Sequence, residues 1–225
     1  DVTLAQSCVE QLQRKFSEES TRVRILQARL HEARGEPDLA TEIYDALLEA
    51  NAANTVALKR RVCVAMSKGG RSDRLAVTAL NEYLETFCSD GHAWHELANM
   101  HMLAGRFSEA AFCYDELVLM DPNNPVFHCR LGECLATLDR PESDKRARQH
   151  LALAVRLSKR EYPRALVALA MVTRAIAGRS GAAAGETNAT LLEGSTKDID
   201  SLYSKSSAPD GLRELAMAAL EAATP

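Results

Sequence analysis

Hydrophobic residues recur along the chain with a helical spacing that repeats about every thirty-five residues. In each repeat a small residue is followed by a larger hydrophobic residue four positions later. A further hydrophobic residue follows three positions after that. This spacing places all three on one face of a helix. The small residues are Ala5, Ala40, Ala76, Ala110 and Ala147, separated by 35, 36, 34 and 37 residues. The pattern predicts stacked helix pairs in which each helix buries one face.

Glycine and proline mark the turns between the predicted helices. Gly35, Gly70 and Gly105 each follow a helical segment, at a point where the chain needs a left-handed residue. The loop "DPNNP", residues 121–125, separates two helices because proline does not continue a helix. Each repeat is therefore expected to be a helix, a short turn, a second helix and a loop.

These features resemble the tetratricopeptide repeat. Residues 91–124 match it most fully, with the family's preferred residue types at Trp94, Leu97, Ala98, Gly105, Ala110, Tyr114 and Pro122. In the earlier repeats the packing positions are held by Ala40, Tyr44, Ala76 and Leu80. The resemblance implies an all-α tetratricopeptide-repeat superhelix, an α-solenoid of antiparallel helix pairs, over residues 1–178. The chain begins at Asp1 without Met, and we expect the first repeat to be truncated.

The C-terminal fifth has a different composition. Residues 179–211 are rich in Gly, Ser, Ala and Thr, which predicts a flexible low-complexity loop or linker. Residues 212–225 predict an amphipathic helix, with one face formed by Leu212, Leu215, Ala216, Ala219 and Leu220. This helix either caps the last repeat or docks on a partner. Capping is the favoured interpretation because the end of a solenoid needs cover.

Composition and charge narrow the function classes. Lys plus Arg is 27 and Asp plus Glu is 31, a net charge of −4 that provides no field for binding nucleic acid. The longest apolar stretch, residues 165–173, is much shorter than the roughly twenty residues of a membrane span. The six cysteines form no Cys-x-x-Cys pair and predict small buried side chains in a reducing, cytoplasmic compartment.

One stretch suggests metal chemistry at first sight. His95 and Glu96 begin a zinc-protease-like pattern, but Asn99 stands where the second histidine is required. His101 lies about 240° further round the helix than His95, so the two do not converge on one ion. No phosphate-binding loop or Gly-x-Ser-x-Gly motif is present. We therefore predict no metal, no cofactor and no catalytic residue.

Protein binding is the remaining function. Stacked repeats form a concave groove lined by the first helix of each pair. By repeat position, the predicted lining is Arg29, Arg61, His95, Asn99, Met102, Arg130 and Glu133. Within it, the basic run Lys59, Arg60 and Arg61 either faces a partner or is a solvated helix face.

A longer segment resembles a more specific family, subunit 2 of the endoplasmic-reticulum membrane protein complex. The resemblance is carried by "LNEYLE" at 80–85, "AWHELA" at 93–98 and "AAFC" at 110–113. It implies a non-catalytic scaffold, peripheral at the cytosolic face of the endoplasmic-reticulum membrane. Its implied partners are the integral and cytosolic subunits of a hetero-oligomeric complex that inserts transmembrane segments, including tail-anchored ones.

The alternative is a soluble co-chaperone adaptor that binds chaperone or client peptides. The first lysine of the adaptor's carboxylate-binding set is missing, and its position is held by Ile25, Arg61, His95 and Cys129 in successive repeats.

Overall fold

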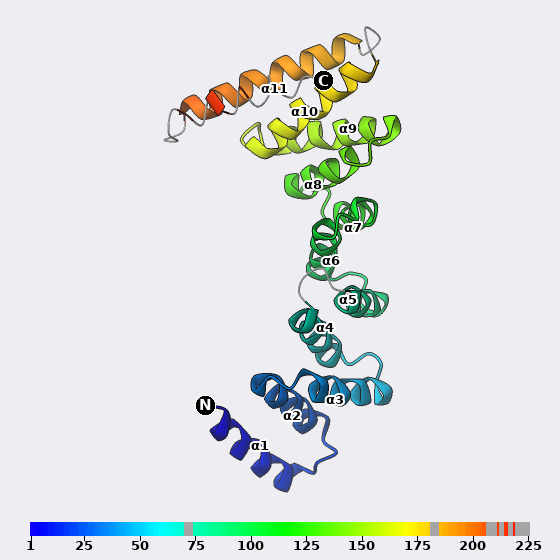
Figure 1. The fold of residues 1–225 in the computed structure, drawn as a ribbon, viewed down its shortest axis with the longest axis vertical. Coiled ribbons are helices and arrows are strands. Elements are labelled where there is room, and N and C mark those ends of the chain that lie inside the picture. Colours follow the sequence, from blue (N-terminus) through cyan, green and yellow to red (C-terminus); the bar gives the residue numbers. More distant parts are fainter. Residues whose placement is uncertain (70–73, 181–184, 206–210, 212–213, 216–217, 219–225) are drawn as a thin grey trace. The chain divides into compact units, whose positions relative to one another are not determined.

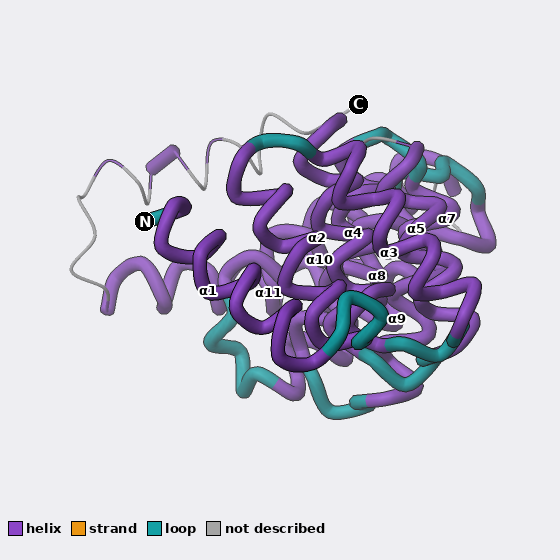
Figure 2. Tube along the Cα trace, turned by 90° about the horizontal axis from the view of Figure 1, so that it is seen from below, coloured by secondary structure: helices purple, strands orange, loops and turns teal. Residues whose placement is uncertain are grey.

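The computed structural model describes residues 1–69, 74–180 and 185–205, together with 211, 214, 215 and 218. In these ranges the regular structure is entirely α-helical, as predicted (Figure 1, Figure 2). The helices are α1 (Val2–Phe16), α2 (Thr21–Arg34), α3 (Pro37–Ala50), α4 (Thr55–Gly69), α5 (Arg74–Thr86), α6 (Gly91–Leu103), α7 (Phe107–Met120), α8 (Pro125–Ala136), α9 (Pro141–Leu157), α10 (Pro163–Ser180) and α11 (Gly185–Lys205).

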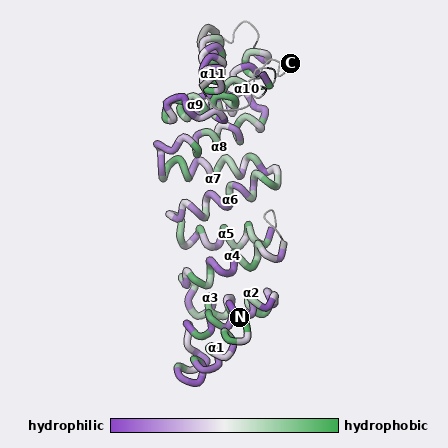
Figure 3. The backbone as a smooth tube through the Cα atoms, turned by 90° about the vertical axis from the view of Figure 1, so that its left-hand side faces the viewer, coloured by the Kyte–Doolittle hydropathy of each residue, from purple (hydrophilic) through white to green (hydrophobic). Residues whose placement is uncertain are grey.

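The chain forms two compact units, Asp1–Ala93 and Trp94–Pro225. In the first unit, each helix from α1 to α5 packs on the next. In the second unit, α8 contacts α7, α9 and α10, and α11 packs on α10. Hydrophobic and hydrophilic positions alternate along the helices (Figure 3). Each helix therefore buries one face, as the sequence spacing requires.

Two predicted glycine turns have the expected geometry. Gly35 and Gly105 have φ angles of 75° and 71°, in the left-handed region. The N–H of Gly35 donates to the carbonyl of Glu32 (3.0 Å) and the next N–H, of Glu36, donates to His31 (2.9 Å). This pair of hydrogen bonds ends the helix in a Schellman motif. The third predicted turn glycine, Gly70, lies outside the described residues.

Small residues allow the helices of each unit to approach closely. In the first unit, one buried cluster is formed by Ala28, Ala40, Tyr44, Leu47, Ala57 and Val64. In the second unit, Gly132 of α8 faces α9. A Cβ atom at this position would lie 2.6 Å from Cγ of Leu151. Because that distance is shorter than a van der Waals contact, only glycine fits without a shift.

The structure differs from the linker expected at 179–211, because Gly185–Lys205 form the helix α11. Ile199 is buried, and Leu191 and Leu192 are half-buried. The hydroxyl of Ser195, which is also buried, donates to the carbonyl of Leu191 (2.8 Å). Arg148 of α9 also donates to Asn188 of α11. Serine hydroxyls that donate to carbonyls of their own helix allow a polar segment to pack as a helix. The prediction of a flexible linker, which rested on composition, was therefore wrong for Gly185–Lys205.

The predicted C-terminal amphipathic helix lies largely outside the described residues, including Leu212, Ala216, Ala219 and Leu220. Leu215, which is described, is exposed. None of the helices in the described part of the chain combines the length and the apolar character that a membrane crossing needs.

Candidate protein-binding surface

Two of the predicted groove residues lie in the first unit. Arg29 is exposed on α2. Arg61 of α4 is half-buried and pairs with Asp45 of α3 (3.2 Å) and with Glu82 of α5. These three side chains line a cavity of about 250 Å³. Arg61 therefore connects three consecutive helices, and its charge is balanced by two carboxylates.

The basic run around Arg61 forms ion pairs inside the unit. Lys59 pairs with Asp90 (3.0 Å), and Arg60 pairs with Glu32, with its Nε 3.0 Å from Oε1. Successive residues on a helix point about 100° apart, so the three cations meet carboxylates from different elements. The run is therefore not a single basic patch: Lys59 is exposed, whereas Arg60 and Arg61 are half-buried in ion pairs.

In the second unit, α6 carries three predicted residues. The hydroxyl of Tyr114 on α7 donates to Oδ1 of Asn99 (3.3 Å), and Asn99 Nδ2 lies 3.3 Å from His95 Nδ1. The His95 ring also contacts Tyr114, edge-on, with the ring centroids 6.3 Å apart. Burial raises the pKa of Tyr114 to about 12, which keeps its hydroxyl protonated as a donor. Met102 is half-buried on the same helix. This part of the surface is held by fixed polar contacts.

The predicted repeat-packing residues occupy three kinds of position. Trp94 is half-buried and contacts the exposed Phe112 edge-on, at 6.0 Å between ring centroids. Gly105 and Pro122 are exposed in turns. The remaining ones are buried: Ala40, Tyr44, Ala76, Leu80, Leu97, Ala110 and Tyr114.

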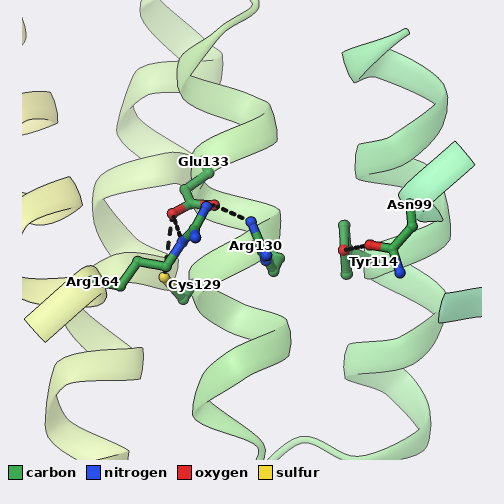
Figure 4. A network of polar contacts seen from close by, with 6 residues as sticks. All are labelled: Asn99, Tyr114, Cys129, Arg130, Glu133 and Arg164. Atoms are coloured by element: carbon green, nitrogen blue, oxygen red, sulfur yellow. Dashed lines mark hydrogen bonds and ion pairs between the residues drawn. The ribbon is translucent and has the colours of Figure 1, made fainter. Parts of the chain in front are cut away.

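Glu133 of α8 is the centre of a charged network in the second unit (Figure 4). Nη1 of Arg130 lies 3.2 Å from Glu133, and Arg164 of α10 donates to both carboxylate oxygens, at 2.5 and 2.9 Å. The Cys129 thiol lies 3.8 Å from the same carboxylate. One carboxylate thus pairs with two arginines and joins α8 to α10.

Sequence reasoning included Arg130 and Glu133 but missed Arg164. A signal for it exists, because Arg164 stands 34 residues after Arg130, one repeat further along the chain. Equivalent positions in successive repeats line the same surface.

The network borders a cavity of about 470 Å³, which we call the α8–α10 groove. It is lined by Glu133, Ala136, Thr137, Pro163, Arg164, Val167, Ala168, Met171, Val172 and Tyr203. Most of these side chains are apolar, and Met171 is half exposed, at 50%. A cavity of this size with an apolar floor and paired charges at its edge suits apolar side chains of a partner.

The buried thiols offer little reactivity. Burial raises the pKa of Cys113, Cys129 and Cys134 to about 12, so each is a protonated thiol at neutral pH. In the described part of the chain, no group of three or more His, Cys, Asp or Glu side chains is placed to hold a metal ion. The arrangement provides packing and hydrogen-bonding contacts.

Solved structures share this fold. YrrB, described as a TPR protein with an unusual peptide-binding site, matches with a TM-score of 0.60 and 15% identity over 95% of this chain and 97% of its own. The C-terminal part of a TPR repeat-containing protein from Cytophaga hutchinsonii matches with a TM-score of 0.64 and 14% identity, over 92% of this chain and 79% of its own. At these identities the likeness shows the tetratricopeptide-repeat fold.

Sequence relatives are more specific. ER membrane protein complex subunit 2-A of Xenopus laevis is 35% identical over 181 residues, which are 80% of this chain and 60% of that protein. ER membrane protein complex subunit 2 of Dictyostelium discoideum is 29% identical over 158 residues, 70% of this chain and 48% of that one. The chain thus spans 60% or less of the length of these relatives.

The model of the EMC2 TPR-like repeat domain matches residues 14–141, more than half of the chain. The chain belongs to the family defined by that domain.

Proposed function

We propose that this chain is a non-catalytic scaffold, the tetratricopeptide-repeat part of a subunit of the endoplasmic-reticulum membrane protein complex. On this proposal it lies at the cytosolic face of the membrane, bound to integral and cytosolic subunits, and supports the insertion of transmembrane segments. Membership of the EMC2 repeat family supports the assignment.

The observation that carries the scaffold role is the α8–α10 groove. Its apolar lining includes the half-exposed Met171, and Glu133 at its edge forms ion pairs with Arg164 and with the neighbouring Arg130. Such a surface gains free energy by covering apolar area, whereas its charges mainly fix geometry. These are properties of a subunit interface, and they require no chemical step.

Co-purification from detergent-solubilised membranes tests the proposal. The tagged full-length protein is compared with Met171→Glu, which places a charge in the groove. Leu119→Glu is the matched control, because Leu119 is exposed on α7 and does not line the groove. We expect wild type and control to recover a stoichiometric set of integral membrane proteins, and Met171→Glu to lose it.

Two results would contradict the proposal. Recovery of cytosolic heat-shock chaperones without membrane subunits would support a co-chaperone adaptor. Equal recovery by both variants would show that the α8–α10 groove is not the interface.

A further inference from the structure

A second cavity of about 470 Å³ lies in the second unit, among α9, α10 and α11, and we call it the α9–α11 pocket. Its floor includes Val155, Leu166 and Leu169, each less than 10% exposed, and Leu191 closes one side. The volume is sufficient for about two large apolar side chains, within the usual range of ligand pockets.

Three cations lie at the edge of this pocket: Arg156, Lys159 and Arg160, all exposed. Arg160 pairs with Asp198 of α11 at 3.2 Å. Among the described residues, neither Arg156 nor Lys159 has an ion-pair partner. The pocket therefore presents unbalanced positive charge beside an apolar floor.

The backbone holds these cations in a defined turn. The N–H of Arg160 donates to Val155 (2.9 Å) and that of Lys159 donates to Arg156 (3.1 Å), the Schellman pattern also seen at Gly35. Lys159 and Arg160 have φ angles of 53° and 65°, where glycine is usual. The fold thus keeps two long cationic side chains at positions where their backbone conformation is unfavourable.

We propose that the α9–α11 pocket binds an acidic amphipathic segment of a partner protein. Leucine-like side chains of the segment enter the cavity above Leu166 and Leu169, and its carboxylates pair with Arg156 and Lys159. Charge complementarity selects an acidic partner, and the apolar floor selects one with apolar side chains beside its acids. The proposal does not depend on the complex in which the chain works.

A peptide fits these observations better than a lipid surface does. Binding in a membrane interface requires apolar side chains that project from the protein beside the cations. Here the apolar side chains are recessed, since Leu166 is fully buried and Leu169 is 3% exposed. A recess of this kind receives side chains from a partner.

The test is fluorescence anisotropy with the full chain and a labelled helical peptide of about fourteen residues, built from Leu at three- and four-residue spacing with Glu elsewhere. We expect saturable binding that weakens about tenfold when salt is raised from about 0.05 to about 0.5 M. A peptide with every Glu replaced by Lys should not bind.

Two variants locate the binding surface. Arg156→Gln with Lys159→Gln should weaken binding about tenfold. The matched control, Arg140→Gln with Lys145→Gln, removes two exposed cations near the start of the same helix and should leave affinity unchanged. Gly194→Leu keeps every charge and fills the cavity, because a Cβ there meets nothing within 4 Å. It should also weaken binding, with the helical circular dichroism retained.

Three results would overturn the proposal. Equal losses in the two cation-pair variants would show general electrostatic attraction. No effect of Gly194→Leu would show that the cavity is not used. If vesicles of phosphatidylcholine with about one third phosphatidylserine bind the chain in an Arg156- and Lys159-dependent way while the peptide does not, the surface is a membrane site.

Discussion

The α8–α10 groove and the α9–α11 pocket have similar volumes, about 470 Å³ each, and both place arginine beside an apolar floor. They differ in what balances the charge. Glu133 forms an ion pair with both Arg130 and Arg164 at the first, whereas Arg156 and Lys159 at the second have no carboxylate partner among the described residues. The presence of arginine therefore does not by itself indicate a binding surface for acidic partners. Whether a surface can bind an acidic partner depends on whether carboxylates of the chain already pair with its cations.

The largest expected effect comes from a change that disturbs the contact of α8 with α9, on which both surfaces depend. Gly132→Ala should destabilise the chain by about 1–3 kcal/mol, because the new methyl group would overlap Leu151. Gly194→Ala is the matched control in α11, where space is open, and should stabilise by up to about 1 kcal/mol through helix propensity. Urea denaturation followed by circular dichroism measures both, and equal signs would contradict the packing argument.

A smaller effect is expected from removing the negative charge of Glu133 at the α8–α10 groove alone. Glu133→Gln should lower the free energy of unfolding by about 1–2 kcal/mol, because Arg130 and Arg164 lose a carboxylate that is 19% exposed. The same urea measurement on Arg156→Gln with Lys159→Gln should show a change within about 0.5 kcal/mol. A larger loss in the second variant would mean that the pocket cations stabilise the fold.

A stabilising change should separate fold from function at the second surface. Lys159→Gly should raise the free energy of unfolding by about 0.5–1 kcal/mol, because glycine adopts a φ of 53° without strain. The same change should weaken binding of the acidic peptide, because it removes one of the pocket cations. The inverse substitution, Gly105→Lys at a φ of 71°, should cost a comparable amount. If Lys159→Gly destabilised the chain, its side chain would be needed for packing.

The sequence pattern was sufficient for the framework of the fold. The spacing predicted five packing alanines; Ala40, Ala76, Ala110 and Ala147 are fully buried, whereas Ala5 in α1 is exposed. Spacing predicts these positions because each repeat packs mainly on its neighbours, so the residues that contact each other recur at a fixed interval in the sequence. Gly105 was found because a left-handed turn favours one residue type.

Three features were beyond the pattern for physical reasons. The α11 helix was missed because hydroxyls such as that of Ser195 bond to their own helix, which composition does not reveal. Arg130 lies three residues before Glu133 on the same helix, but Arg164 comes from α10, and only the packing of α10 on α8 brings it to this carboxylate. The turn at Lys159 was missed because its geometry matches a glycine turn without containing glycine.

The smallest effect expected is on the reactivity of the cysteine thiols, which reports on the contact of Glu133 with Cys129 beside the α8–α10 groove. At pH 8, iodoacetamide should label the exposed Cys8, Cys63 and Cys88, whereas the buried Cys113 and Cys129, with pKa values raised to about 12, should react slowly.

Glu133→Gln should increase labelling of Cys129 relative to Cys113, because the carboxylate beside Cys129 also raises its pKa. Peptide mass spectrometry gives the rate at each cysteine. Equal rates at all cysteines of the native chain would contradict the burial described above.

Hydrogen exchange of the full chain with and without the acidic Leu–Glu peptide compares both surfaces in one experiment. We predict slower exchange at residues 152–160 and 190–198, which border the α9–α11 pocket, and unchanged exchange at residues 133–137 of the α8–α10 groove. Slower exchange at 133–137 without protection at 190–198 would contradict it, and would mean that internal pairing with Glu133 does not decide which surface accepts an acidic partner.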